Sequence, residues 1–461
     1  MNALLVICGL SIVSLLAEIA NFKKWLTAIV IISLLIATAT LTMEWDGEPA
    51  TYFSSMLMFD QVALAFTGLI AVVSILWFWM ASDYFRAQPQ HRTERTSLVI
   101  FVIVGAILMA SYNNMAMLFL GIEILSLSLY VLAGSNKESL LSIEAAFKYF
   151  LMGSFATGFL LMGITLLYGA TGSFDITTIA YVITERGQAL PSFFYAGVLL
   201  LLVGLAFKIS AVPFHFWAPD VYGGAPTTVT AFMSTVVKIG ALAAFCRMFS
   251  IGLIATYSTW STILMVITVL TLVLPNITAV YQSHVKRILA YSSVGHVGYI
   301  LLAFTVDPTA SSGVIYYYLA SYAVASIAAF SVLHLVEGNS ESITIEYFNG
   351  LFKRNPLLAV GLTIALLSLA GIPPFPGFFG KYMVFALAIA KGYTPLVIVA
   401  VVTSLIGVYY YFRVIIAMYF QAPQQVTPLS VSSSQRALTF VLIALSFALG
   451  IFPDAVLSLI Q

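Results

Sequence analysis

The sequence predicts an all-α polytopic membrane protein with about fourteen transmembrane helices. Of its 461 residues, 61% are hydrophobic and only 8% are charged, which is about a third of the charged fraction of soluble domains. The apolar runs are continuous over about 18 residues or more, as helical spans require, whereas the strands of outer-membrane barrels alternate apolar and polar residues. A soluble chain of this length could not bury so much apolar surface.

Hydropathy defines the spans, and helix breakers lie within or directly after two of them. Pro213 follows the seventh span and removes a backbone N–H that a continuing helix would need. The twelfth span is too long for one straight helix, and Pro373, Pro374 and Pro376 divide it into two halves. The expected spans are 2–20, 25–43, 57–81, 97–112, 114–134, 142–169, 192–211, 226–250, 258–282, 287–305, 311–336, 356–390, 395–420 and 437–458.

Lysine and arginine residues set the expected orientation. Loops after odd-numbered spans, including 82–96 and 338–355, hold or adjoin twelve of them, whereas the other face holds only Arg186, Arg247 and Lys391. Cytoplasmic loops carry the excess of basic residues. We therefore expect both termini on the non-cytoplasmic side of a bacterial inner membrane.

Four charged residues inside spans are the main site candidates: Glu123, Lys208, Lys238 and Lys381. A charge at mid-bilayer costs roughly 2.5–3.5 kcal/mol on insertion scales, so these groups must be paired, hydrated or neutral. Lysine suits proton transfer because desolvation brings the pKa of an ammonium group towards neutrality, whereas arginine keeps its proton. The pattern predicts an ion path, with fixed ion pairs that hold helices together as the alternative.

Other polar groups in the spans are weaker candidates. Lys148 lies near the end of its span and could extend to the membrane surface. His296 and His334 are candidate accessory relay residues or hydrogen-bonded core residues. Tyr316–Tyr318 and Tyr409–Tyr411 read as packing and interface anchors. No histidine spacing predicts a metal site, no motif predicts a nucleotide or flavin site, and the net charge of +1 suggests no nucleic-acid partner.

Several motifs resemble those of the antiporter-like membrane subunits of respiratory complex I. The resemblance covers most of residues 57–420 and is most specific at 207–226 and 371–381. The matching stretches are Phe119-Leu-Gly-Ile-Glu-Ile-Leu-Ser-Leu-Ser-Leu-Tyr130, Glu144-Ala-Ala-Phe-Lys-Tyr-Phe150, Phe207-Lys-Ile-Ser-Ala-Val-Pro-Phe-His-Phe-Trp-Ala-Pro-Asp-Val-Tyr-Gly-Gly-Ala-Pro226, Lys286-Arg-Ile-Leu-Ala-Tyr-Ser-Ser293 and Gly371-Ile-Pro-Pro-Phe-Pro-Gly-Phe-Phe-Gly-Lys381.

This resemblance implies a fold of two inverted five-helix repeats with broken seventh and twelfth helices. Residues 1–96 would form the first three helices, 97–250 and 251–420 the two repeats, and 421–461 the last helix. It also implies a proton pathway in which Glu123 pairs with Lys208, Lys238 is the central carrier and Lys381 ends the path, with Lys148 and His296 as accessory members.

The implied function is proton translocation as part of a quinone-reducing translocase, with no redox site in this chain. NADH, FMN, iron–sulfur clusters and quinone would be bound by the whole complex. The expected partners are a neighbouring antiporter-like subunit, small membrane subunits and the lipid bilayer. Two alternatives stay open: a subunit of a sodium/proton antiporter without redox chemistry, and a structural membrane scaffold.

Overall fold

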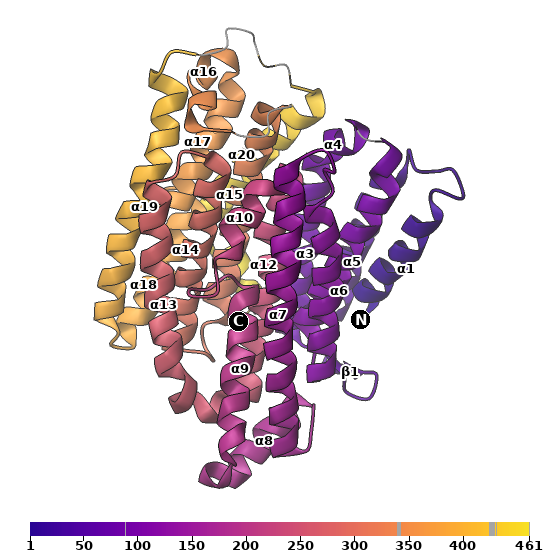
Figure 1. Cartoon of the computed structure of the whole chain (residues 1–461), viewed down its shortest axis with the longest axis vertical. Coiled ribbons are helices and arrows are strands. Elements are labelled where there is room, and N and C mark those ends of the chain that lie inside the picture. Colours follow the sequence, from indigo (N-terminus) through magenta and orange to yellow (C-terminus); the bar gives the residue numbers. More distant parts are fainter. Residues whose placement is uncertain (88, 339–342, 424–428, 430, 461) are drawn as a thin grey trace. The chain divides into compact units, whose positions relative to one another are not determined.

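The computed structural model describes residues 1–461 except 88, 339–342, 424–428, 430 and 461 (Figure 1). Two compact units account for the chain. Unit 1 comprises residues 1–135, 146–210 and 236–266, and unit 2 comprises 136–145, 211–235 and 267–461. Parts of the expected 82–96 and 338–355 loops lie outside the described residues.

Unit 1 is built around one helix that is apolar on all sides. Helix α5 contacts α1, α3, α6 and α12 and is buried along most of its length, as expected for a helix without a polar face. The helices of unit 1 are α1 (Asn2–Leu16), α2 (Leu26–Glu44), α3 (Gln61–Met80), α4 (Ser82–Ala87), α5 (Arg92–Ser111), α6 (Met115–Ala133), most of α7 (Leu140–Thr171), α8 (Ile176–Arg186), α9 (Ser192–Lys208), α12 (Lys238–Arg247) and the start of α13 (Tyr257–Val280).

Helices α7 and α9 run side by side in unit 1 (Figure 1). Two glycines permit their close approach, because a Cβ atom on Gly163 would lie 2.7 Å from the backbone nitrogen of Leu201 and 2.9 Å from the carbonyl oxygen of Gly197. Small residues at helix contacts are typical of membrane proteins, where association depends on packing rather than on the exclusion of water.

The sharp turn between α5 and α6 lies where the sequence predicts it, at residues 112–114. The Asn114 side chain accepts a hydrogen bond from the Ala116 N–H and caps α6. The Asn113 side-chain amide donates to the Asp175 carboxylate at 2.6 Å. These side chains satisfy backbone and side-chain groups that a turn of this length leaves outside a helix.

Three elements of unit 1 lie outside the sequence-based expectations. Strands β1 (Ala50–Tyr52) and β2 (Leu57–Phe59) form an antiparallel hairpin, and β2 replaces the first turn of the expected third span. Helix α8 occupies a connection that hydropathy leaves outside the membrane. It buries Ile176, Ile179 and Ile183, whose spacing gives one apolar face on an otherwise polar helix.

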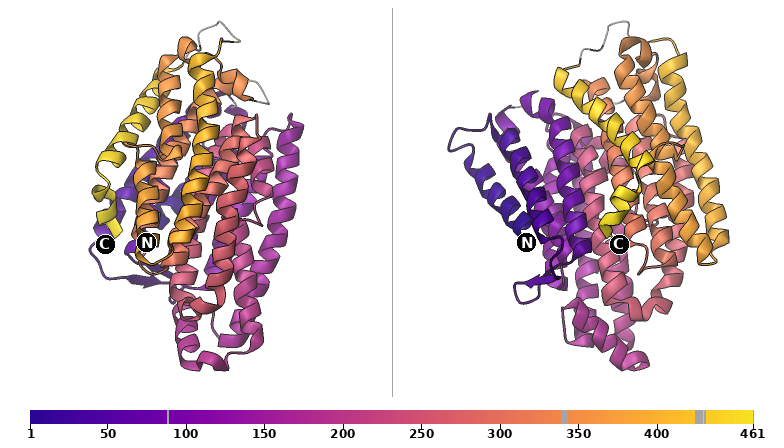
Figure 2. Two further views of the ribbon diagram at one scale, coloured as in Figure 1. Left: turned by 90° about the vertical axis from the view of Figure 1, so that its left-hand side faces the viewer. Right: turned by 180° about the vertical axis from the view of Figure 1, so that it is seen from behind.

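Unit 2 has two core helices, α14 (Val285–Val306) and α15 (Ser312–Glu337), which are buried along most of their length. Helix α15 contacts α11, α17, α18 and α20, and the yellow α20 crosses the neighbouring helices in Figure 2. The remaining α-helices of unit 2 are the start of α7, α10 (Trp217–Gly224), α11 (Thr227–Phe232), the rest of α13, α16 (Leu351–Arg354), α17 (Pro356–Ala370), α18 (Pro376–Ala390), α19 (Thr394–Phe420), α20 (Ser433–Ile451) and α21 (Asp454–Leu457).

In the described part of the chain, eleven helical segments are long and apolar enough to cross a membrane. Four shorter apolar helices, α1, α9, α17 and α18, lie in the remaining expected spans. The protein is therefore a largely helical, multi-pass membrane protein, as the composition predicts. One of these segments, Thr227–Gly252, joins α11 to α12 through a π-helical turn at Met233–Val237.

Both expected breaks separate helices. Helix α9 ends at Lys208 and α10 begins at Trp217, with Pro213 between them. Helix α17 ends at Ala370 and α18 begins at Pro376. Pro373 and Pro374 lie in the second gap, whereas Pro376 is the first helical residue of α18, a position where its missing N–H has no helical partner to lose.

Candidate functional site

Lys208 is the last residue of α9 and is buried in unit 1. Its ammonium group donates a hydrogen bond to Ser126 Oγ at 2.7 Å and lies 5.8 Å from the centroid of the Tyr149 ring. The Ser126 hydroxyl in turn donates to the carbonyl oxygen of Ile122. Its lone pairs are therefore directed at Lys208, and the negative face of the tyrosine ring adds favourable electrostatic energy.

Glu123 lies on α6, one helical turn before Ser126, so the two side chains share a face of that helix. Ser126, rather than Glu123, is the side chain that accepts the hydrogen bond from Lys208. Within the described part of the chain, Glu123 Oε1 is buried and receives no hydrogen bond. A buried carboxylate oxygen without a donor is costly when charged, so this carboxyl group is a candidate for proton uptake or for pairing with Lys208.

Lys238 is 2% exposed and is the first residue of α12. The π-helical turn Met233–Val237 immediately precedes it. Such turns interrupt the regular hydrogen-bond ladder and occur frequently at functional sites. A Cβ atom on Gly240, two residues further on, would lie 2.9 Å from the Cβ atom of Ala106 on α5. The segment carrying Lys238 is therefore held closely against the core helix of unit 1.

Lys381 caps the C-terminal end of a helix other than its own. It lies on α18 and donates to the carbonyl oxygens of Leu369 at 3.2 Å and Ala370 at 2.8 Å, the last two residues of α17. The two preceding carbonyl groups accept from the Gly371 N–H. All four terminal carbonyl groups of α17 are thus satisfied, and a cation lies at the negative end of the helix dipole.

The third hydrogen bond of the Lys381 ammonium group goes to Ser404 Oγ at 2.9 Å. Its nitrogen also lies 5.0 Å from the centroid of the Tyr299 ring. Gly371 has a φ of +84°, and a Cβ atom there would lie 2.8 Å from Cδ of Lys381. Glycine is therefore required at this position both by the left-handed backbone and by the path of the lysine side chain.

His296 is buried in unit 2 between two phenol groups. Its Nδ1 lies 2.7 Å from Tyr318 Oη, and its Nε2 lies 3.3 Å from Tyr411 Oη. Tyr411 Oη also hydrogen bonds with Ser292 Oγ. A neutral imidazole has one donor and one acceptor nitrogen, so this row of groups can pass a proton through the ring by exchanging which nitrogen carries the hydrogen.

Tyr299 connects the histidine row with Lys381. It lies one helical turn after His296, its ring stacks on that of Tyr318 with centroids 6.4 Å apart, and the Lys381 ammonium nitrogen lies 5.0 Å from its ring centroid. These contacts bring two of the sequence-predicted residues, His296 and Lys381, into one polar cluster within unit 2.

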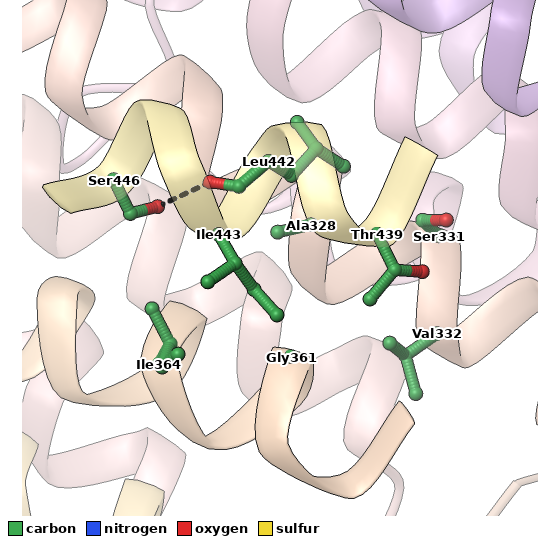
Figure 3. A pocket seen from close by; sticks show the side chains of 9 residues that line it. All are labelled: Ala328, Ser331, Val332, Gly361, Ile364, Thr439, Leu442, Ile443 and Ser446. Carbon is green, nitrogen blue, oxygen red and sulfur yellow. Dashed lines mark hydrogen bonds between the residues drawn. The ribbon is translucent and has the colours of Figure 1, made fainter. Parts of the chain in front are cut away.

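Two further sequence-predicted candidates are only half-buried. Lys148 is half-buried on α7, and His334 is half-buried in the last turns of α15. A small cavity lies between α15, α17 and α20 (Figure 3). It has no titratable side chain, and its lining consists of Ala328, Ser331, Val332, Gly361, Ile364, Thr439, Leu442, Ile443 and Ser446.

Sequence reasoning missed several residues that contact the predicted ones, among them Ser126, Tyr149, Tyr299, Tyr318, Ser404 and Tyr411. Tyr318 and Tyr411 belong to runs expected to be packing anchors, yet both hydrogen bond with His296. One signal was available, because Ser292, His296 and Tyr299 follow the i, i+4, i+7 spacing of a single helix face. No sequence signal identifies Ser126 or Ser404, because serine is common in apolar helices.

Comparisons with known proteins agree with this architecture. Residues 112–407 match the family model described as NADH:quinone oxidoreductase/Mrp antiporter, TM. NADH-quinone oxidoreductase subunit N of Cytophaga hutchinsonii is 42% identical over 100% of this chain and 99% of the relative, and that of Flavobacterium psychrophilum is 41% identical over 100% of both. A chain of respiratory complex I from Thermus thermophilus superposes with a TM-score of 0.85 at 33% identity, over 99% of this chain and 98% of that chain.

The chain belongs to the antiporter-like membrane subunits of complex I, within the family of NADH-quinone oxidoreductase subunit N. The resemblance of its motifs to that subunit is confirmed. It is a proton-translocating, multi-pass membrane subunit of a bacterial translocase, and it works with the other membrane subunits of the complex. The cofactors of the complex belong to other subunits.

Proposed function

We propose that protons cross this subunit through Glu123, Lys208, Lys238 and Lys381, with Lys148, His296 and His334 as accessory groups. The observation that carries the proposal is that the three lysines are each at most 6% exposed within helices of an apolar chain. Intramembrane ionisable residues are rare and usually mark ion pathways. Lysine is the basic side chain that can release a proton in a desolvated site.

Each lysine has a distinct part in the proposed pathway. Lys208 is coupled to Glu123 through the shared face of α6, so protonation of the carboxyl group changes how strongly the ammonium group is held. Lys238 is the central carrier. Lys381 ends the path. When its ammonium group releases a proton, it loses one of its hydrogen bonds to Leu369, Ala370 or Ser404.

The finer fold belongs to the same proposal. Eleven long segments, α1, α9 and the joined pair α17 and α18 give fourteen crossings. Residues 97–250 and 251–420 form two inverted five-helix repeats, residues 1–96 precede them, and 421–461 contribute the last helix. With fourteen crossings, the bias of basic residues puts both termini on the non-cytoplasmic side.

The test is proton uptake by vesicles that contain the complete complex with Lys238→Ala or Lys238→Arg. Both variants should assemble and lose proton transfer through this chain, the second because a guanidinium group stays charged. Lys137→Arg, at an exposed lysine, should pump like the wild type. Wild-type proton uptake per NADH in the assembled Lys238→Arg complex would rule out a titrating lysine and favour a structural role for these charges.

The same vesicles separate proton pumping from sodium/proton exchange. Uptake driven by NADH should be independent of sodium concentration and should persist when a sodium ionophore is present. Proton movement that requires a sodium gradient and no NADH would instead favour the antiporter reading, which the family description also includes.

A further inference from the structure

A lysine, a glutamate and a threonine surround the connection between α10 and α11, all within unit 2. Lys286 is the second residue of α14, Glu337 is the last residue of α15, and Thr227 is the first residue of α11. The side chains of Lys286 and Glu337 are only 8% and 13% exposed. The pathway proposed above does not use them, and a buried ion pair is expensive to form unless its hydrogen bonds are completed.

Lys286 completes the C-terminal end of α10. Its ammonium nitrogen lies 2.9 Å from the carbonyl oxygen of Ala225, the residue that follows the last turn of that helix. A cation that donates to a terminal carbonyl group satisfies an acceptor without a helical partner and opposes the negative end of the helix dipole.

Glu337 lies at the N-terminal end of α11. Pro226 precedes this helix and provides no side-chain cap. The Thr227 hydroxyl donates to Glu337 Oε2, while Oε1 lies 3.4 Å from the Lys286 ammonium nitrogen. The carboxylate thus places negative charge at the positive end of α11, from a residue 110 positions away in the sequence.

The ion pair therefore contacts both ends of the three-residue joint 225–227, because Lys286 bonds to Ala225 and Glu337 bonds to Thr227. Helices α10 and α14 are in contact, as are α11 and α15. Each of the two hydrogen bonds therefore joins helices that already pack together. The joint leads directly into the helical segment Thr227–Gly252, on which Lys238 lies.

We infer that Lys286 and Glu337 are positioning residues for proton transfer, because they fix the joint from which the helix of Lys238 begins. This inference rests on the proposed role of Lys238. A neighbouring ion pair provides a control: Arg287 and Asp220 also join α14 to α10, at 3.3 Å, but their side chains are 40% and 37% exposed. Exposed pairs contribute little.

The experiment compares variants of the complete complex in vesicles, with proton uptake per NADH and the amount of assembled complex measured on each. Lys286→Met combined with Glu337→Gln removes both charges together, so no buried charge is left without a partner. We expect normal assembly but at least a threefold lower proton uptake per NADH. Lys286→Arg retains a donor for the Ala225 carbonyl group and should keep at least half of the wild-type proton uptake per NADH. Arg287→Gln should match the wild type.

Two further variants test the inference independently of the doubly neutral variant. Exchanging the charges, with Lys286→Glu and Glu337→Lys, should fail to restore pumping, because a carboxylate cannot donate to the Ala225 carbonyl group. Thr227→Val removes one hydroxyl and no charge. It should therefore assemble normally and pump more slowly, even if the doubly neutral variant does not assemble. Wild-type pumping by Thr227→Val or by the charge exchange would overturn the inference.

Lys238→Arg in the same series separates the inference from the function on which it rests. If Lys238→Arg stops pumping while the doubly neutral variant pumps normally, the positioning role is wrong and the pathway stands. If Lys238→Arg pumps normally, the pathway itself is wrong.

Discussion

The ammonium group of Lys381 lies 2.8 Å from the carbonyl oxygen of Ala370, so a residue of α18 closes the end of α17. In the sequence, Lys208 precedes its break and Lys381 follows its own, which makes the two look dissimilar. In the structure, Lys208 ends α9 and Lys381 reaches back to the end of α17. Each lysine is therefore associated with the C-terminal end of the helix before a break.

Replacing Lys381 should separate its structural role from proton transfer. Lys381→Met leaves the carbonyl groups of Leu369 and Ala370 without this donor, at a cost of about 1–3 kcal/mol for each buried acceptor. We expect a lower melting temperature of the purified complex and loss of proton uptake. Lys381→Arg can still donate to both carbonyl groups, so stability should largely return while proton uptake stays low.

The exposed Lys353 provides the matched control, because Lys353→Met removes a charge from the same unit without touching a buried acceptor. Its melting temperature should stay close to that of the wild type. Equal melting temperatures for Lys381→Met and Lys353→Met would mean that the hydrogen bonds at the end of α17 contribute nothing measurable.

Glu123 and Lys208 should be energetically coupled although Ser126 accepts the hydrogen bond. We expect that Glu123→Gln and Lys208→Ala each lower proton uptake, and that the double variant loses less than the two single losses combined, with a coupling of about 0.5–3 kcal/mol. Strictly additive losses in this double-mutant cycle would show that the two groups act independently.

Ser126→Ala tests the hydroxyl group that lies between these charges. The change removes the acceptor of the Lys208 hydrogen bond and should slow proton uptake without preventing assembly. Ser128→Ala is its control, since the Ser128 hydroxyl donates only to the Ile124 carbonyl of its own helix among the hydrogen bonds described. If both variants pump at the same rate, Ser126 has no role beyond that of an ordinary buried serine.

Cysteine labelling tests the orientation inferred from lysine and arginine. With Cys8 and Cys246 replaced by serine, Glu346→Cys should react with an impermeant maleimide only in inside-out vesicles. Thr178→Cys, on an exposed position of α8, should react only in intact right-side-out preparations. The reverse pattern at both positions would invert the topology, and reaction of both from one side would remove a crossing between them.

The ion pair between Asp307 and Lys391 predicts a pH dependence of stability. Asp307 lies between α14 and α15, outside both spans, and its carboxylate is 2.8 Å from the Lys391 ammonium nitrogen. Burial raises the pKa of Asp307, but hydrogen bonds from Lys391, Ala310 and Thr309 outweigh it and lower this pKa to about 2. A folded-state pKa below the unfolded value of about 3.9 stabilises the fold above pH 4 and loses that effect as the pH falls towards 2.

Asp307→Asn should therefore reduce stability by about 1–2 kcal/mol at neutral pH, an estimate that allows for the half-exposed lysine. The difference from the wild type should be constant between pH 8 and pH 5 and should shrink below pH 4. Thermal unfolding of the purified complex across this range measures it. A difference that grows as the solution becomes more acidic would contradict the sign of the effect.

Hydropathy predicts the helices well because a membrane helix needs a long uninterrupted apolar run. The two breaks are equally visible, since proline residues at 213 and 373–374 cannot continue a helix. By contrast, α8 and the β1–β2 hairpin lie in connections, where hydropathy carries little information. Pro376 shows the remaining ambiguity, because a proline opens a helix as readily as it ends one.

The candidate site is only partly readable from the sequence. Charged residues in apolar runs are rare enough to identify Glu123 and the three lysines directly. Their partners are serine, tyrosine and backbone carbonyl groups from distant segments, such as Ser126 for Lys208 and Ala370 for Lys381. These groups are common throughout the chain, so only the three-dimensional arrangement distinguishes the ones that contact these four residues.

The π-helical turn before Lys238 changes the helical phase of everything that follows it. A turn closed by i→i+5 hydrogen bonds holds one residue more than an α-helical arrangement would place there. Since each residue advances an α-helix by about 100°, the same residues wound as a regular α-helix through 233–237 would turn Lys238 by about that angle relative to Thr227. A single-residue deletion within 233–237 should instead convert the π-helical turn into an α-helical one and leave Lys238 facing the same neighbours.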